Sequence, residues 1–100
     1  MQSVVSEYLL TGSENAISST DLCQMLNVER RELERQIMVE RRQGIPICAS
    51  CNGRNPGYFL AEDQETMERY CKVLRKRMGE IAKTYRALKG SIDALPERET

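Results

Sequence analysis

The chain has no histidine, no tryptophan and a single phenylalanine among its 100 residues. Without histidine it lacks the commonest metal ligand and the side chain most often used as a general acid or base near neutral pH. It also has no glycine-rich phosphate loop and no pair of carboxylates placed to share a cleft, so the sequence predicts neither an enzyme nor a bound cofactor. With so few aromatic residues, the core has to consist of aliphatic and sulfur-containing side chains.

Long apolar runs are missing as well. No stretch approaches the length that spans a membrane, and residues 1–10 lack the basic and apolar blocks of a signal peptide. The sequence therefore predicts a soluble, cytoplasmic protein without membrane contact.

An excess of charge of either sign is also absent, because 15 basic residues balance 15 acidic ones. The charges are unevenly distributed: residues 1–28 hold three acidic and no basic side chains, whereas residues 63–89 hold eight basic and four acidic ones, a net charge of +4. A strongly basic composition would by itself indicate a nucleic-acid partner. Here any such interpretation has to rest on local geometry.

Four cysteines are present: Cys23, Cys48, Cys51 and Cys71. Cys48 and Cys51 form a CxxC motif, but a structural zinc site needs two more ligands at a similar spacing. We expect Cys23 and Cys71 to act as small apolar residues on helical faces. The prediction is free thiols and no metal, with zinc binding as the alternative.

A first helix is predicted over residues 2–11, followed by Gly12. Its apolar side chains fall on one face of a helix: Val4, Val5, Tyr8 and Leu9.

A second helix is predicted to begin at Ser18 or Ser19, either of which can cap the free N–H groups of a first turn. Ile17 is placed to pack over that turn, and Asp21 suits its dipole. The helix should end at Asn27, because asparagine tolerates the left-handed conformation of a sharp turn. Its buried face is formed by Leu22, Cys23 and Leu26.

A third helix is predicted from about Glu29 to Gln43, with Gly44 ending it and Pro46 preventing its continuation. Residues 45–50 then form a strand, the segment CNGRNPG forms a turn, and residues 58–60 return as a second strand. Eight apolar residues from these elements should form one buried cluster: Leu22, Leu26, Val28, Leu33, Ile37, Ile47, Tyr58 and Leu60.

Several short motifs follow one another in a recognisable order. They are Ile17-Ser18, the small residue Cys23, the turn at Asn27, an arginine-rich helix, Gly44-Ile45-Pro46-Ile47 and Gly57-Tyr58-Phe59-Leu60. In this order residues 17–62 resemble the winged helix-turn-helix domains of biotin-operon-repressor-like and DeoR-like bacterial regulators. The resemblance implies an α+β fold over residues 1–62, with three helices and a β-hairpin wing, that binds double-stranded DNA.

Eight residues are candidates for DNA binding in this fold. They lie at the start of the second helix (Ser19, Thr20), on the third helix (Arg30, Arg31, Arg35) and at the tip of the wing (Asn52, Arg54, Asn55). Each group has a plainer alternative: helix capping, a solvated salt-bridged helix surface, or an ordinary hairpin turn. Carboxylates at Glu29 and Glu34 would repel phosphate, so the alternative function is a winged-helix protein–protein adaptor without DNA binding.

Residues 63–89 are predicted as a coiled-coil-like region with one helix over 64–89, and residues 90–100 as a flexible tail after Gly90. The apolar residues of the helix alternate spacings of four and three, which is a heptad pattern. We call this row the seam: Met67, Cys71, Leu74, Met78, Ile81, Tyr85 and Leu88.

The C-terminal helix should extend well beyond the domain that precedes it. Twenty-six helical residues span roughly 39 Å, whereas a domain of about 60 residues has a radius of gyration of only about 10–11 Å. The seam is therefore predicted to form a homodimer. Opposite charges do not pair in a parallel dimer, while an antiparallel one can set Glu68 against Lys89 of the partner subunit; both arrangements stay open. The predicted function is a dimeric DNA-binding protein, a transcriptional or replication-associated regulator.

Overall fold

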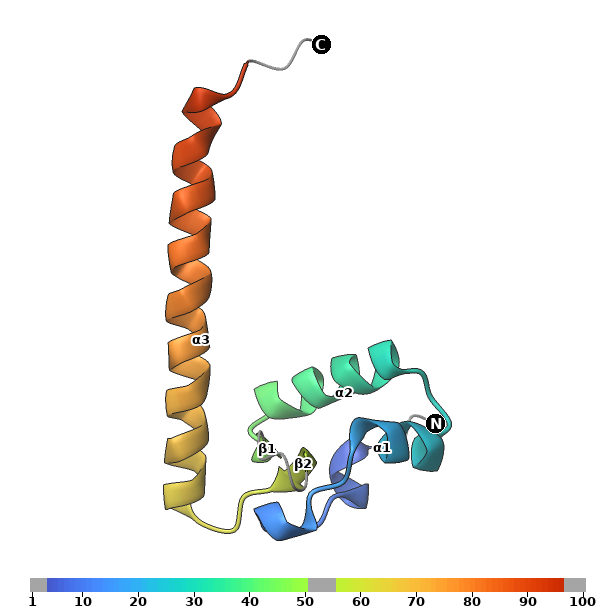
Figure 1. Ribbon diagram of the computed structural model, residues 1–100. Helices are drawn as coiled ribbons and strands as arrows, with labels where there is room; N and C mark the ends of the chain where they lie inside the picture. Colours follow the sequence, from blue (N-terminus) through green and yellow to red (C-terminus); the bar gives the residue numbers. More distant parts are fainter. Residues whose placement is uncertain (1–3, 51–55, 97–100) are drawn as a thin grey trace. The chain divides into compact units, whose positions relative to one another are not determined.

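The computed structural model describes residues 4–50 and 56–96. It is an α+β chain with a two-stranded antiparallel hairpin and a long C-terminal helix (Figure 1). In chain order the elements are the short 3-10 helices η1 (Val5–Tyr8) and η2 (Ser13–Asn15), helices α1 (Ser19–Leu26) and α2 (Arg30–Arg42), strands β1 (Ile47–Ser50) and β2 (Gly57–Leu60), helix α3 (Gln64–Ser91) and the 3-10 helix η3 (Ile92–Ala94). Contacts divide the chain into two compact units, Met1–Tyr70 and Cys71–Thr100.

The turn between α1 and α2 forms where the local signals predicted it. The hydroxyl of Ser18 accepts a hydrogen bond from the backbone N–H of Asp21 at 3.1 Å and caps α1. Asn27 ends that helix in the left-handed conformation, with φ 54° and ψ 51°. Helix α2 then ends before Gly44, whose φ of +95° is accessible to glycine at little cost. The expected turn between these two helices is confirmed.

The predicted first helix is wrong. Residues 5–8 form only a single 3-10 turn, and the chain is extended at Leu9. Val5 and Leu9 are buried as expected, but Tyr8 is exposed. The physical reason is a residue distant in the sequence. The carboxylate of Glu40, on α2, accepts hydrogen bonds from the first N–H groups of this turn and so fixes the segment against α2.

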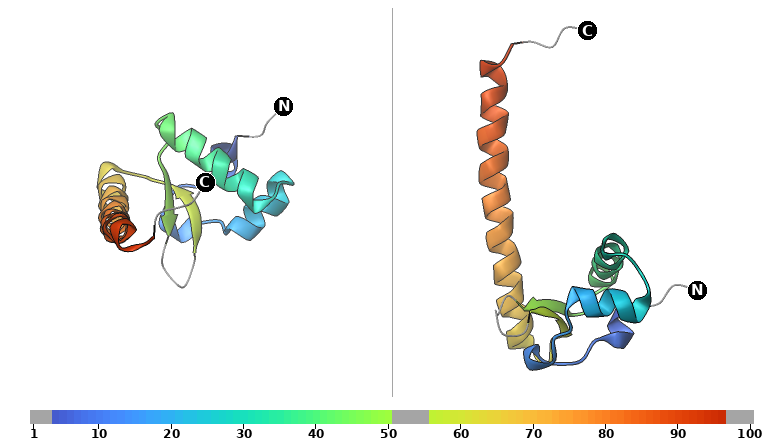
Figure 2. Two further views of the ribbon diagram at one scale, coloured as in Figure 1. Left: turned by 90° about the horizontal axis from the view of Figure 1, so that it is seen from above. Right: turned by 45° about the vertical axis from the view of Figure 1, so that its right-hand side comes forward.

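The hairpin pairs Ile47 with Leu60 and Ser50 with Gly57, and Figure 2 shows its strands side by side. A third segment joins its free edge, because Ile17 and Tyr58 exchange two backbone hydrogen bonds of 2.9 Å. The close approach of residues 17–18 to β2 requires glycine at position 57. There φ is +150°, and an added Cβ would lie 2.8 Å from the backbone nitrogen of Ser18.

Both faces of the hairpin are covered. All eight residues predicted to form one buried cluster belong to it, but only Leu22, Leu33, Ile37 and Ile47 are buried, whereas Leu26, Val28, Tyr58 and Leu60 are partly buried and pack against them. Val5, Leu9, Ile17, Cys23 and Ile45 join the same cluster. On the other face, Cys48, Phe59 and Tyr70 form a second buried cluster with Met67 packed against it. Because Tyr70 is the last residue of the first unit, the opening turns of α3 belong to the folded core of that unit.

Helix α3 begins after Asp63, whose carboxylate accepts the backbone N–H of Thr66 at 2.8 Å. That hydrogen bond lowers the pKa of Asp63 below its ordinary value. The predicted end at Gly90 is wrong, since the helix passes through Gly90 to Ser91 and continues into η3. In residues 4–50 and 56–96, no helix combines the length and the apolar character needed to cross a membrane.

Candidate functional site

Helix α2 is held in place by a buried carboxylate. Glu40 is 1% exposed and accepts hydrogen bonds from the backbone N–H groups of Val5 at 2.7 Å and Ser6 at 2.8 Å, and from the side-chain amide of Gln36 at 2.8 Å. Burial acts to raise the pKa of this carboxyl, but the hydrogen bonds outweigh it, and the pKa lies below its ordinary value. Glu40 is therefore an ionised anchor inside the first unit.

The next residue, Arg41, is a second anchor. Its Nε donates to the carbonyl oxygen of Ile47 at 2.9 Å, and its Nη2 donates to the hydroxyl of Tyr70 at 2.9 Å. The guanidinium also lies 5.1 Å from the centre of the Tyr70 ring and 5.8 Å from that of Tyr58. Arg41 thus ties α2 to β1, β2 and the start of α3, and is not available to an external ligand.

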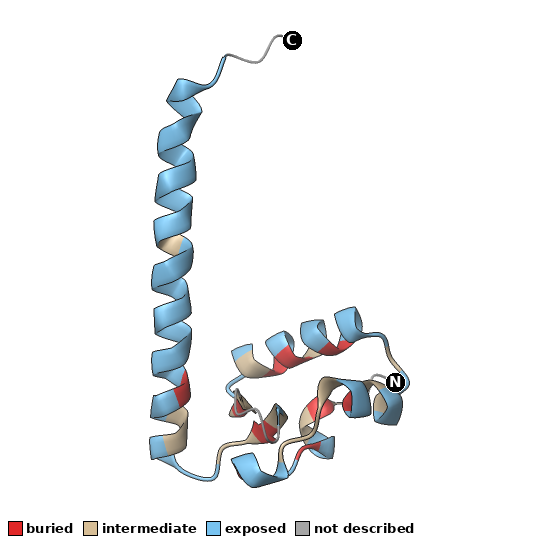
Figure 3. Cartoon of the chain, in the orientation of Figure 1, coloured by how far each residue is buried: buried red, intermediate tan, exposed pale blue. Residues whose placement is uncertain are grey.

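The opposite side of α2 is basic and open. Leu33, Ile37 and Glu40 define the buried side, and Figure 3 shows exposed positions on the side turned away from it. Four residues spaced four, three and four apart occupy the exposed side, which we call the basic face: Arg31, Arg35, Met38 and Arg42. None of these three arginines forms an ion pair or hydrogen bond with any residue that the structure describes.

Glu29 and Glu34, the carboxylates expected to repel phosphate, lie outside this face. Glu34 pairs with Arg30 at 3.6 Å, and Arg30 also donates to the hydroxyl of Ser19 on α1 at 3.3 Å. Glu29 is the N-cap residue of α2 and so precedes its first turn. Of the two carboxylates expected to disturb an anion site, Glu34 is therefore paired with Arg30 and Glu29 lies at the helix end.

The predicted DNA-binding residues consequently separate into three groups. Arg31 and Arg35 belong to the basic face, and Arg42 joins them although the sequence interpretation did not include it. Arg30 and Ser19 contact each other at the flank, and Thr20 is exposed at the start of α1. The wing-tip candidates Asn52, Arg54 and Asn55 lie outside the described residues.

Signals for Arg42 are present in the sequence. Once Leu33 and Ile37 are assigned to the core, the helical period places residues 31, 35, 38 and 42 opposite them. The resemblance draws attention to the N-terminal half of the helix, where recognition helices usually meet base edges, and so the last turn is overlooked.

The basic face contains no cysteine. Cys48 is completely buried, and its Sγ lies 3.6 Å from the sulfur of Met67, while Cys51 is outside the described residues. Cys23 and Cys71 are free cysteines. Within the described ranges, no group of three potential metal ligands comes together. Freedom from metal stays a prediction.

The second unit presents the outer part of the seam. Apart from Ala82, which is half-buried, every described residue from position 71 onward is exposed. The large seam side chains here are uncovered: Met78 is 68% exposed, Ile81 69%, Tyr85 59% and Leu88 64%. Met67, by contrast, packs against the second cluster of the first unit.

Comparisons with protein-family models, with curated proteins and with solved structures gave no match to this chain. A functional assignment therefore depends on the chemistry of the two exposed surfaces, the basic face of α2 and the seam of α3.

Proposed function

We propose that the protein binds double-stranded DNA as a homodimer, with a winged helix-turn-helix in its first unit and α2 as the recognition helix. The basic face carries this proposal. It sets three arginines without partners among the described residues on one side of a 13-residue helix, with Met38 between them. An α-helix fits the major groove of B-DNA, and arginine binds both phosphate oxygens and the acceptor edge of guanine.

The surrounding fold supports the same arrangement. A short helix, a left-handed turn at Asn27 and a second helix precede the hairpin, and the pairing of Ile17 with Tyr58 adds a third extended segment to it. This order of elements suits a winged helix, in which the hairpin would act as the wing. We infer a regulatory role in transcription or replication, which a small DNA-binding module can perform.

The test is duplex binding over a salt series, measured by fluorescence anisotropy with mixed-sequence fragments. Contacts to phosphate release counterions, so the affinity should fall steeply as salt rises. Arg35→Ala and Arg42→Ala should each weaken binding by about 1–3 kcal/mol for a base contact, or reduce the salt slope by about one for a phosphate contact. Their melting temperatures should match that of the parent, because Arg35 and Arg42 are both exposed.

Arg86→Ala is the matched control. It removes the same charge from an exposed position on α3, outside the basic face and outside the seam. If Arg86→Ala weakens binding as much as Arg35→Ala, the attraction comes from general charge and the basic face has no special role. If the parent shows no salt-dependent binding at all, DNA binding is ruled out.

One observation favours a protein–protein adaptor as the second candidate. Met25 is 48% exposed, Met38 42% and Val39 39%, so α1 and α2 present apolar side chains beside the arginines. Exposed methionine and arginine are both common in protein interfaces. Failure of DNA binding would make this function the better one.

A further inference from the structure

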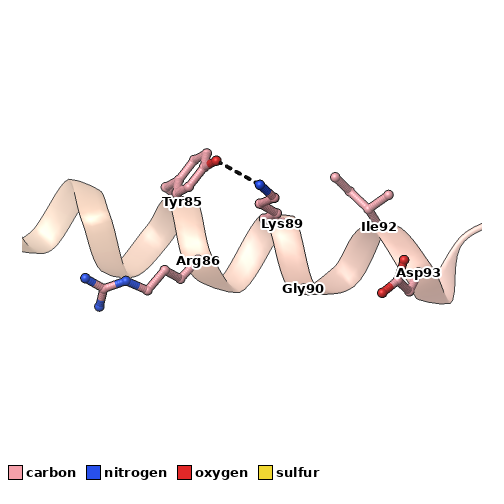
Figure 4. Close-up of a pocket in the computed structure, with 6 residues that line it drawn as sticks. All are labelled: Tyr85, Arg86, Lys89, Gly90, Ile92 and Asp93. Atoms are coloured by element: carbon pink, nitrogen blue, oxygen red, sulfur yellow. Dashed lines mark hydrogen bonds between the residues drawn. The ribbon is translucent and has the colours of Figure 1, made fainter.

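The seam of α3 continues beyond the helix that was expected to carry it. Because Gly90 does not end the helix, Ile92 follows Leu88 at a spacing of four, in the 3-10 turn that continues α3. Ile92 is 62% exposed. Figure 4 shows Tyr85, Lys89 and Ile92 on one side of the helix and Arg86 and Asp93 on the other. The uncovered apolar row therefore runs from Cys71 to Ile92.

We infer that a second copy of this chain covers the seam from Cys71 to Leu88 in antiparallel orientation, with Met78 of one copy opposite Ile81 of the other. This inference uses the homodimer of the proposed function but does not depend on its DNA binding. Rows of exposed apolar residues at heptad spacing are the interaction surface of coiled coils. The remaining question is the direction, and the residues flanking the seam decide it.

In a parallel pair, the flanking positions form no attractive contacts. In a parallel coiled coil, a flanking residue of one copy faces the residue five positions later in the other copy. Here Tyr70 faces Arg75, Arg77 faces Ala82 and Thr84 faces Lys89. Not one of these pairs joins opposite charges.

The antiparallel pair has better electrostatics. With residues 78 and 81 opposite each other, Glu68 of each copy faces Lys89 of the other, so two ion pairs form by symmetry. The other basic residues at the flanks, Arg75 and Arg77, then face Ala82 and Thr84, so like charges do not meet.

Glu68 and Lys89 are both exposed and weakly engaged within their own chain. Gln64 donates to Glu68 at 3.4 Å, and Lys89 donates to the Tyr85 hydroxyl at 3.3 Å (Figure 4). Both interactions are exposed and long, so either side chain can turn to a partner with little loss.

The antiparallel register also matches side-chain sizes. A parallel pair sets identical seam residues against one another, so Tyr85 would meet Tyr85 and Cys71 would meet Cys71. In the antiparallel register Tyr85 packs against Leu74, and Cys71 packs against Leu88. Large residues then alternate with smaller ones along the interface, which fills space more evenly.

Disulfide mapping distinguishes the two directions, because Cys71 is a free, exposed thiol within the seam. In the antiparallel dimer the two Cys71 residues are roughly 25 Å apart, about 17 residues at about 1.5 Å each, and cannot be bridged. Leu88→Cys places a thiol directly opposite Cys71 of the other copy. Under mild oxidation, the full-length protein should form no Cys71–Cys71 link, and the Leu88→Cys variant should join Cys71 to the thiol introduced at position 88.

Peptide mass spectrometry identifies which cysteines are joined, and the double variant Leu88→Cys with Cys71→Ser is the control. It should lose the cross-link if the pair is antiparallel, whereas a parallel pair would join the two introduced thiols at position 88 to each other. A Cys71–Cys71 link in the unmodified protein overturns the proposed direction.

Sedimentation of the unmodified chain tests whether a second copy of the chain covers the seam. At tens of micromolar it should be a dimer, and Ile81→Asp should shift it toward monomer because the seam would bury a carboxylate without a cation opposite. Lys76→Asp, on the side of α3 opposite the seam, should leave it dimeric. A monomeric parent overturns the inference whether or not the protein binds DNA. A dimer in which Cys71 links to the thiol introduced at position 88 supports the inference even if DNA binding fails.

Discussion

Glu40→Gln is the substitution that tests the anchoring of α2 most directly. The amide has nearly the same shape as the carboxylate but carries no charge, and one of its two heavy atoms donates instead of accepting. In the parent, Val5 donates to Oε2 and Ser6 to Oε1, and Gln36 also donates to Oε2. At least one of these donors must therefore lose its acceptor inside a site where Glu40 is 1% exposed.

The expected cost follows from the kind of bond that is lost. A hydrogen bond to a charged group contributes about 1.5–3 kcal/mol, and a buried donor left unpaired costs about 1–3 kcal/mol. We expect Glu40→Gln to lower the free energy of unfolding by about 2–4 kcal/mol at neutral pH, a large share of the stability of a small domain. Glu34→Gln is the matched control: its side chain is 60% exposed, so loss of its pairing with Arg30 should cost less than about 1 kcal/mol.

The pH dependence has a defined sign. The pKa of Glu40 is lower in the folded protein than in the unfolded chain, so its contribution is complete above the ordinary glutamate pKa of about 4.3 and is lost as the pH falls through the lowered folded value. The stability difference between parent and Glu40→Gln should therefore be constant from about pH 7 to about pH 5 and shrink below that. Comparing the two proteins cancels the contribution of Asp63, which titrates in both.

Urea unfolding of the full chain gives the free energies, and amide hydrogen exchange gives the local effect. The N–H groups of Val5 and Ser6 should exchange faster in Glu40→Gln than in Glu34→Gln. A loss of stability below about 0.5 kcal/mol, or unchanged protection of these two amides, would contradict the role assigned to Glu40.

Two further substitutions test the core and the hairpin. Leu33→Ala removes a side chain that is completely buried and should cost about 2–5 kcal/mol by urea unfolding, whereas Met25→Ala, at an exposed position of α1, should stay within about 0.5 kcal/mol; equal effects would mean that the face of α2 is misassigned. Gly57→Ala should cost more than about 1 kcal/mol, because its Cβ would meet the backbone of Ile17 and Ser18, whereas Gly79→Ala has open space around it and should stabilise α3 by up to about 1 kcal/mol. A Gly57→Ala protein as stable as the parent would contradict the close approach between β2 and residues 17–18.

The parts of the fold that the sequence predicted correctly are those with local causes. Ser18 caps α1 through a residue three positions away, and Asn27 adopts the left-handed conformation that the turn needs. The buried face of α2 follows from its helical period. In each case the deciding interaction lies within a few residues.

The errors have non-local causes. The apolar spacing at Val5 and Leu9 suits a helix, yet Glu40 holds that segment as a single 3-10 turn from 35 residues away. In the run Val39 to Arg42, Glu40 and Arg41 look like solvated charges, and only tertiary packing shows that both point inward. Gly90 predicts a helix end because glycine is common there, but no close contact or left-handed conformation at this position requires a break.

The charges of α2 therefore serve two purposes that depend on their position around the helix. Glu40 and Arg41 face inward and connect α2 to η1, β1 and Tyr70, whereas Arg31, Arg35 and Arg42 face outward without partners among the described residues. A helix held at several points presents its outward side chains in a fixed register, so little conformational entropy is lost when they bind a rigid anionic surface. Loss of Glu40 should consequently reduce binding only by reducing the folded fraction, whereas loss of Arg35 should reduce binding in a fully folded protein. Stability and affinity measured on the same two variants separate the anchor of the helix from its binding surface.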